Sequence, residues 1–209
     1  MRTVIAIVCL GLLAWGQAAV AAEPTVALTV SRHPSVKAFT DDEIRKALQD
    51  ASEVMRKAQC PVTFTLNGSV RKFTKGAPAK IVSMRDLDKA HSEPTDVKIV
   101  KEIKCCVEKA GEYAGCSWPP KEGSHSIILI EKQLLLGNRW AHEFGHRMGL
   151  KHRDEPGEAT AATMPLMVSE GVSERAVEVS TEECKCFQNP GQCHINLVPN
   201  VKPADKCPR

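Results

Sequence analysis

Aromatic residues are scarce in this 209-residue chain, where they make up 4% of the sequence and include a single tyrosine. A dominant charge is also missing, because 28 Lys and Arg residues stand against 25 Asp and Glu residues and the basic residues are not clustered. A nucleic-acid-binding surface needs clustered cations, commonly with stacking aromatics, so we expect no nucleic-acid partner. The chain also lacks internal repeats and low-complexity segments, and its length predicts one or at most two domains.

Long hydrophobic runs are absent except at the N-terminus. There a single arginine is followed by the uncharged run Val4–Trp15 and by a zone of small residues, Ala18–Ala22. This order predicts a secretory signal peptide over residues 1–22, cleaved after Ala21 or Ala22. An uncleaved anchor is the alternative, disfavoured because the apolar core is shorter than the ~20 residues that span a bilayer. We therefore expect a secreted protein, periplasmic in a Gram-negative bacterium, with no membrane contact after cleavage.

Cysteine is the second indication of an oxidising compartment. Of nine cysteines, Cys9 falls in the signal segment, and the other eight form an even set that predicts disulfides. The sequence does not select their pairing, but a bond between the neighbours Cys105 and Cys106 would be strained, so we expect different partners for them. A second zinc site at Cys184-x-Cys186 is the competing interpretation. Its spacing is shorter than that of common structural zinc sites, which disfavours it.

Hydrophobic periodicity predicts a mixed order of helices and strands. A capping-box pattern at Thr40–Glu43 precedes apolar residues at helical spacing and predicts a helix over 41–58. The runs Val62–Leu66 and Ser69–Phe73 flank Asn67-Gly68, which predicts a β-hairpin. Further strands are expected over Val26–Val30, Ala79–Met84, Val97–Val107 and Ser126–Ile130, and a loop is expected over Gly111–Pro120. Two further helices are expected, one from Leu134 or Asn138 to Met148 and one over Thr181–Phe187.

The segment from His142 to His152 reads HEFGHRMGLKH and carries the chemistry. His142 and His146 are four residues apart, so a helix places both imidazoles on one face, where neutral imidazole is a good zinc ligand. Glu143 is rotated by about 100° from that face and lies beside the metal, where it can take a proton from water. Gly149 tolerates positive φ and can end the helix, so that a turn brings His152 back to the metal.

Three protein ligands leave one position open for water, which is typical of a catalytic zinc site rather than a structural one. A bare HExxH match can also be a surface helix with two histidines. The third histidine at a fixed distance, with a glycine between, makes that interpretation unfavourable here. The remaining histidines have no ligand spacing and are expected to be surface or hydrogen-bonded residues; they are His33, His91, His125 and His194.

The pattern HExxHxxGxxH resembles the metzincin clan of zinc metallopeptidases, and the chain is similar to its small secreted, matrixin-like members. The resemblance implies a single catalytic domain over residues 23–209. The implied fold is α+β, with a mixed, mostly parallel sheet, an active-site helix and a cysteine-rich C-terminal subdomain. A substrate cleft would separate about residues 23–149 from about 150–209.

The resemblance also implies a methionine-containing turn beneath the metal, for which Met167 is preferred and Met164 is the alternative. Gly115–Trp118 occupies the chain position of the edge strand that pairs with substrate, with Trp118 either a cleft wall or a core residue. Unlike some clan members, this chain has no tyrosine after the methionines. Clan analogy also allows calcium, but the sequence has no clear carboxylate-rich calcium loop.

These patterns together predict a secreted, monomeric, zinc-dependent endopeptidase that acts on protein or peptide substrates. One catalytic Zn²⁺ would be held by His142, His146 and His152, and Glu143 would serve as general base toward a zinc-activated water. The alternatives are a zinc-binding interaction protein on a peptidase scaffold with little turnover, and a zinc hydrolase acting on a non-protein substrate. An intact Glu143 favours an enzyme, because a pure binder has no need of that base.

Overall fold

The computed structural model describes residues 23–106, 109–117, 126–153, 162–168, 172–189, 193 and 206–208. The predicted signal peptide, Trp118, His125 and His194 lie outside this part of the chain. Within it, no helix is long and apolar enough to cross a membrane.

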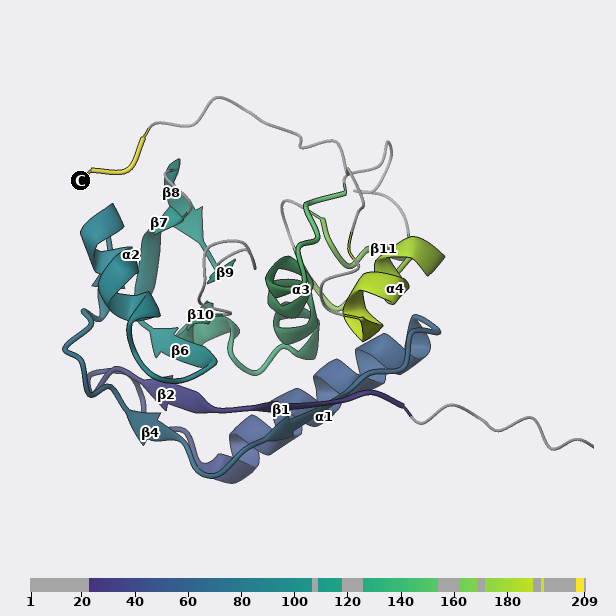
Figure 1. The fold of residues 1–209 in the computed structure, drawn as a ribbon, viewed down its shortest axis with the longest axis horizontal. Coiled ribbons are helices and arrows are strands. Elements are labelled where there is room, and N and C mark those ends of the chain that lie inside the picture. The colour runs from purple at the N-terminus through teal and green to yellow at the C-terminus, as the bar shows by residue number, and fades with distance from the viewer. Residues whose placement is uncertain are drawn as a thin grey trace, which may run out of the picture.

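Four helices and twelve short strands make up the described chain (Figure 1). The helices are α1 (Asp41–Lys57), α2 (Met84–His91), α3 (Gly137–Arg147) and α4 (Thr181–Gln188), and a 3₁₀ turn covers Glu131–Gln133. The strands are β1 (Thr25–Leu28), β2 (Val30–Arg32), β3 (Thr63–Leu66), β4 (Arg71–Lys72), β5 (Lys80–Ile81), β6 (Val97–Val100), β7 (Glu102–Cys106), β8 (Lys109–Tyr113), β9 (Gly115–Ser117), β10 (Ile127–Ile130), β11 (Met164–Pro165) and β12 (Ala176–Glu178).

The largest sheet has five strands in the order β4-β2-β6-β10-β9. The pairs β4–β2, β2–β6 and β6–β10 are parallel, whereas β9 runs antiparallel to β10 at the end of the sheet. The predicted fold class, α+β with a mixed and mostly parallel sheet, is therefore confirmed. Buried strands of parallel sheets are apolar on both faces, which explains the continuous run Ile127–Leu129 that the sequence places in a buried strand.

Helices α1 and α3 pack against each other in the main hydrophobic core, and Figure 1 shows α3 standing over α1. The capping box predicted for α1 is present, since Thr40 accepts from the Glu43 backbone and Glu43 accepts from the Thr40 backbone. Gly137 begins α3 at a point of close approach, because a Cβ there would lie 2.6 Å from the Ala51 backbone nitrogen. The helix predicted over 41–58 is confirmed as α1. Of the two predicted starts for α3, Asn138 is nearer than Leu134 to the observed start at Gly137.

The predicted hairpin at Asn67-Gly68 is wrong. Strand β3 pairs in parallel with β1, and β4 pairs in parallel with β2, so the chain continues in one direction through Asn67. Leu66 is opposite Leu28 and Arg71 is opposite Ser31, which leaves two extra residues on the later strand. Gly68, with a φ of 79°, lies in the link between β3 and β4, where the chain continues rather than reverses. The Asn-Gly pair correctly indicates a positive φ at Gly68, but it does not indicate which strands pair.

Other strand predictions need correction in their bounds. The stretch Val26–Val30 belongs to two strands that divide at Thr29, whose backbone nitrogen donates to Asp96 Oδ2 instead of a neighbouring strand. The stretch Val97–Val107 also divides, because β6 and β7 join different sheets. Gly111–Pro120 is not a loop throughout, since β8 and β9 occupy it up to Ser117. The strand expected over Ala79–Met84 is only β5, and Met84 begins α2.

All eight cysteines beyond the signal segment form disulfides: Cys60–Cys184, Cys105–Cys207, Cys106–Cys116 and Cys186–Cys193. The prediction that Cys105 and Cys106 have different partners is confirmed. The competing zinc site at Cys184-x-Cys186 is wrong, because both sulfurs are in disulfides. The pair Cys60–Cys184 fastens α4 to the C-terminal end of α1, so the cysteine-rich C-terminal part is joined to the main core.

Candidate metal centre

Helix α3 and the turn after it carry the three predicted histidines. The helix ends at Arg147 with Met148 as its C-cap, and Gly149 then adopts a φ of 96°, which a residue with a side chain rarely adopts. The backbone nitrogen of Leu150 donates to Gly145 O at 3.0 Å and closes this turn. His152 is thereby returned to the helix, and one ligand atom from each of His142, His146 and His152 lies within 4.8 Å of the others.

Two of these imidazoles are oriented by backbone carbonyls. His142 Nδ1 donates to Leu166 O and His146 Nδ1 donates to Leu150 O, both at 2.8 Å. Because a carbonyl oxygen can only accept, each Nδ1 must carry a proton, which leaves Nε2 as the ring nitrogen that can bind a metal. Such partners fix the tautomer and ring orientation of metal-binding histidines.

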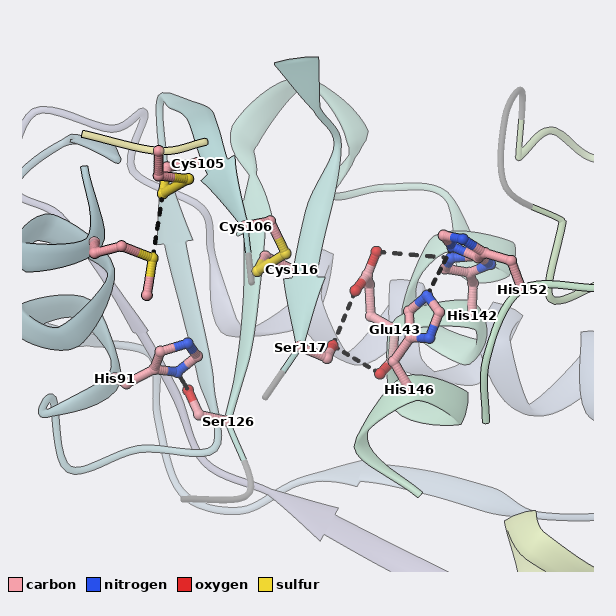
Figure 2. Close-up of a disulfide and its surroundings, with 12 residues drawn as sticks. His91, Cys105, Cys106, Cys116, Ser117, Ser126, His142, Glu143, His146 and His152 are labelled. Atoms are coloured by element: carbon pink, nitrogen blue, oxygen red, sulfur yellow. Dashed lines mark hydrogen bonds and ion pairs between the residues drawn. A yellow bond between two sulfur atoms is a disulfide. The ribbon is translucent and has the colours of Figure 1, made fainter. Parts of the chain in front are cut away.

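The histidine nitrogens fit a zinc ion. His146 Nε2 and His152 Nε2 are 3.0 Å apart, and the rings of His142 and His146 are perpendicular. Figure 2 shows the three histidines gathered together. Burial holds the pKa of His142 well below its usual range, so this imidazole is neutral, the form that binds a metal. Three imidazole nitrogens converging on one point are a donor set typical of zinc.

Glu143 lies between this cluster and strand β9 (Figure 2). Its Oε1 faces the histidines, 4.0 Å from His142 Nε2, and its Oε2 accepts a hydrogen bond from Ser117 Oγ at 2.9 Å. Arg139, one helical turn before Glu143, places Nη1 at 3.8 Å from Oε1. Burial raises the pKa of Glu143, and the positive charges of its neighbours and the Ser117 hydroxyl oppose this effect.

Strand β9 comes very near to Glu143 because residue 115 is glycine. A Cβ at Gly115 would lie 2.2 Å from Glu143 Oε1. Ser117, two residues along the same strand, also contacts the backbone carbonyl of Glu143, with its Oγ at 2.8 Å. Sequence reasoning missed both contacts, and it missed Arg139, although the four-residue spacing between Arg139 and Glu143 was a usable signal.

Met167 lies beneath the metal-site helix. A Cβ on Gly145 would lie 2.4 Å from Met167 Sδ, so this glycine lets the methionine approach α3 closely. Leu166, the preceding residue, supplies the carbonyl that holds His142. Met164 instead belongs to a separate small cluster with Val168, Val172 and Ala176. Contact with the site therefore favours Met167 over Met164.

The other described histidines do not join the site. His33 Nδ1 is hydrogen-bonded with Ser35 Oγ at 2.7 Å, and His91 Nδ1 with Ser126 Oγ at 2.8 Å. Burial, together with the nearby charge of Lys98, lowers the pKa of His91 to about 3. Among the described residues, the three histidines of α3 and its following turn are the one group arranged to hold a metal ion.

Comparison with known proteins gives a likeness of fold at low identity. No protein-family model matches the chain, and no curated protein matches it. A solved structure described as "Structure of a chaperone-substrate complex" is similar with a TM-score of 0.52 and 11% identity, over 79% of this chain and 33% of that one. Metalloproteinase-II from Bacteroides fragilis is similar with a TM-score of 0.49 and 12% identity, over 80% of this chain and 54% of that one. This chain thus spans about a third and about half of the two structures, and at these identities the likeness concerns fold alone.

Proposed function

We propose that this protein is a secreted zinc-dependent endopeptidase of the metzincin type, similar to its small matrixin-like members. The observation that carries the proposal is the convergence of His142, His146 and His152 on one point with Glu143 beside them. Three histidines alone would suit a binding site. A buried carboxylate directed toward the same point adds a group that can accept a proton there, which favours an enzyme over a binding site.

The chemistry would divide between the metal and Glu143. His142, His146 and His152 would hold the zinc, which would supply Lewis acidity toward water and the substrate carbonyl. Glu143 Oε1, on the histidine side, accepts the proton of the attacking water and later returns it to the leaving amine. The hydrogen bond from Ser117 to Oε2 restrains the carboxylate, so that Oε1 keeps facing the metal site.

Strand β9 is the surface on which a peptide substrate would bind. It is the last strand of the five-stranded sheet within the described residues, and its Ser117 contacts Glu143 directly. An extended peptide adds to such an edge through main-chain hydrogen bonds, which accept many side chains. This arrangement would bring a peptide carbonyl near Glu143 and favours an endopeptidase over a hydrolase of small non-peptide substrates.

The test is digestion of a denatured protein mixture by the purified protein, with cut sites read by mass spectrometry. The wild type should cut, chelation should abolish cutting, and added zinc should restore it. Glu143→Ala should keep zinc but lower kcat by ~10²–10⁴, because it removes the base alone. His146→Ala should lose the metal itself, as measured by zinc stoichiometry.

The outcomes separate the proposal from its alternative. If the wild type binds one zinc per chain yet cuts nothing, the endopeptidase proposal fails, and a zinc-binding interaction protein becomes the better account. If Glu143→Ala cuts as fast as the wild type, the assigned base is wrong even though the protein is a peptidase.

A further inference from the structure

His152 is the one histidine of the site that does not lie on a helix. Its neighbour Arg153 forms an ion pair with Glu183 of helix α4. We propose that the ion pair between Arg153 and Glu183 is a positioning device that fixes His152 for the metal. Neither residue would touch the metal. The inference rests on the proposed zinc site but not on peptidase activity.

The chain around His152 is held at two levels. At the backbone, Arg153 N donates to Met167 O at 2.8 Å, which ties this segment to the residue beneath α3. At the side chain, Arg153 Nε donates to Glu183 Oε1 at 3.0 Å, and Nη2 reaches Glu178 O at 3.4 Å. His152 lies between the Gly149 turn and this anchored arginine, so movement of Arg153 would move the imidazole.

Glu183 serves two purposes with its two carboxylate oxygens. Oε2 accepts from Ser180 N at 2.7 Å, and Ser180 Oγ accepts from Glu183 N at 3.2 Å, which completes a capping box at the start of α4. Oε1 remains for Arg153. The Glu183 side chain is only 1% exposed, and a carboxylate so buried is stable only when it is paired or fully hydrogen-bonded.

Helix α4 is a firm support for this anchor. The disulfide Cys60–Cys184 joins it to the end of α1, at the residue directly after Glu183. Phe187 stacks on Phe144 of the metal-site helix with ring centroids 6.3 Å apart. The position of α4 is therefore restrained on both sides, and the bond to Glu183 restrains Arg153 in turn.

A capping box elsewhere in the chain provides the matched control. Glu43 forms the same reciprocal bonds with Thr40 at the start of α1, but its side chain is 36% exposed and far from the histidines in the chain. Glutamine preserves a capping box, since its side-chain oxygen also accepts from the N-cap backbone. Glu183→Gln and Glu43→Gln thus make the same chemical change, and only the first removes the charge that binds Arg153.

The experiment measures zinc affinity by competition with a chromophoric chelator on the full secreted chain. Outer partners of metal ligands typically contribute 10–100-fold in affinity, and this pair acts through one further residue, so we expect Glu183→Gln to weaken zinc binding about 10-fold. Glu43→Gln should stay within about twofold of wild type. The cobalt-substituted Glu183→Gln protein should also show an altered visible absorption spectrum, which a change in stability alone would not produce.

Arg153→Gln is the second variant, and it covers a failure of Glu183→Gln to fold, because the Arg153 side chain is already 21% exposed. If the two residues act as one unit, the double variant should bind zinc no more weakly than either single variant. Wild-type affinity and an unchanged cobalt spectrum in both single variants would overturn the inference. A wild type that binds no zinc would overturn it together with the proposed function, whereas one that binds zinc without cutting peptides would leave the affinity comparison to decide it.

Discussion

Substituting Gly115 by alanine should disable the site while leaving the fold in place. The new Cβ would lie 2.2 Å from Glu143 Oε1, whereas ordinary contacts begin at 3.4 Å, so the carboxylate must retreat by about 1.2 Å (3.4 − 2.2). A displacement of about 1 Å in a catalytic group can cost ~10²-fold in rate. The φ of Gly115 is not positive, so alanine suits the backbone there. We therefore expect a loss of ~10²-fold in kcat.

The assay is steady-state cleavage of a fluorogenic peptide chosen from the mapped cut sites, with zinc stoichiometry and Tm measured on the same samples. Gly111→Ala is the control, because it adds the same methyl group to β8, the preceding strand in the chain and part of another sheet, where it would meet the Tyr113 ring at 3.2 Å. Gly115→Ala should keep its zinc and a Tm near that of the control. If Gly115→Ala is as active as Gly111→Ala, then Glu143 is not the base or its carboxylate does not work from this position.

Two further predictions concern other buried polar groups. Ser117→Ala should lower kcat by about 10-fold with KM and zinc content unchanged, because it frees one oxygen of Glu143 without removing the base; an unchanged kcat would show that Oε2 needs no restraint. His91 should make the fold acid-sensitive: its folded pKa of about 3 lies below its unfolded value of 6.5, so the unfolded chain binds the extra proton and stability falls as pH drops from 6.5 toward 3. Urea unfolding at several pH values should show a shallower loss in His91→Gln than in wild type.

The metal-site residues were predictable from sequence because their geometry is local. A four-residue spacing on a helix fixes two imidazoles on one face, and one glycine with positive φ returns the third within six residues. The capping box of α1 is predictable for the same reason, since Thr40 and Glu43 need only each other. In each case the partners are close in sequence, and the bond between them defines the local backbone.

The contacts that complete the site depend on strand pairing, which the sequence does not reveal. Ser117 reaches Glu143 only because β9 lies antiparallel to β10 at the sheet end and next to α3. The same limit explains the failure at Asn67-Gly68, where a strong turn signal lies in the link between two strands that each pair in parallel with an earlier strand. Strand pairing is stabilised by residues distant in sequence, so a local pattern cannot distinguish a reversal of the chain from its continuation.

The disulfides bear on this division between local and distant support. His142 and His146 are held by a helix in the main core, but the two other supports of the site are short segments far apart in the chain. On one side, Cys116 lies between Gly115 and Ser117, the residues that contact Glu143, and its bond to Cys106 fastens β9 to β7. On the other side, Cys184 follows Glu183, and its bond to Cys60 fastens α4 to α1. Strand β9 has three residues and helix α4 has eight, and elements this short bury little surface of their own. Alone they would not fix the Glu143 carboxylate or the segment that carries His152 to within a fraction of an ångström. Cross-links at the adjacent residues supply that restraint, so reduction should impair the site before it unfolds the core.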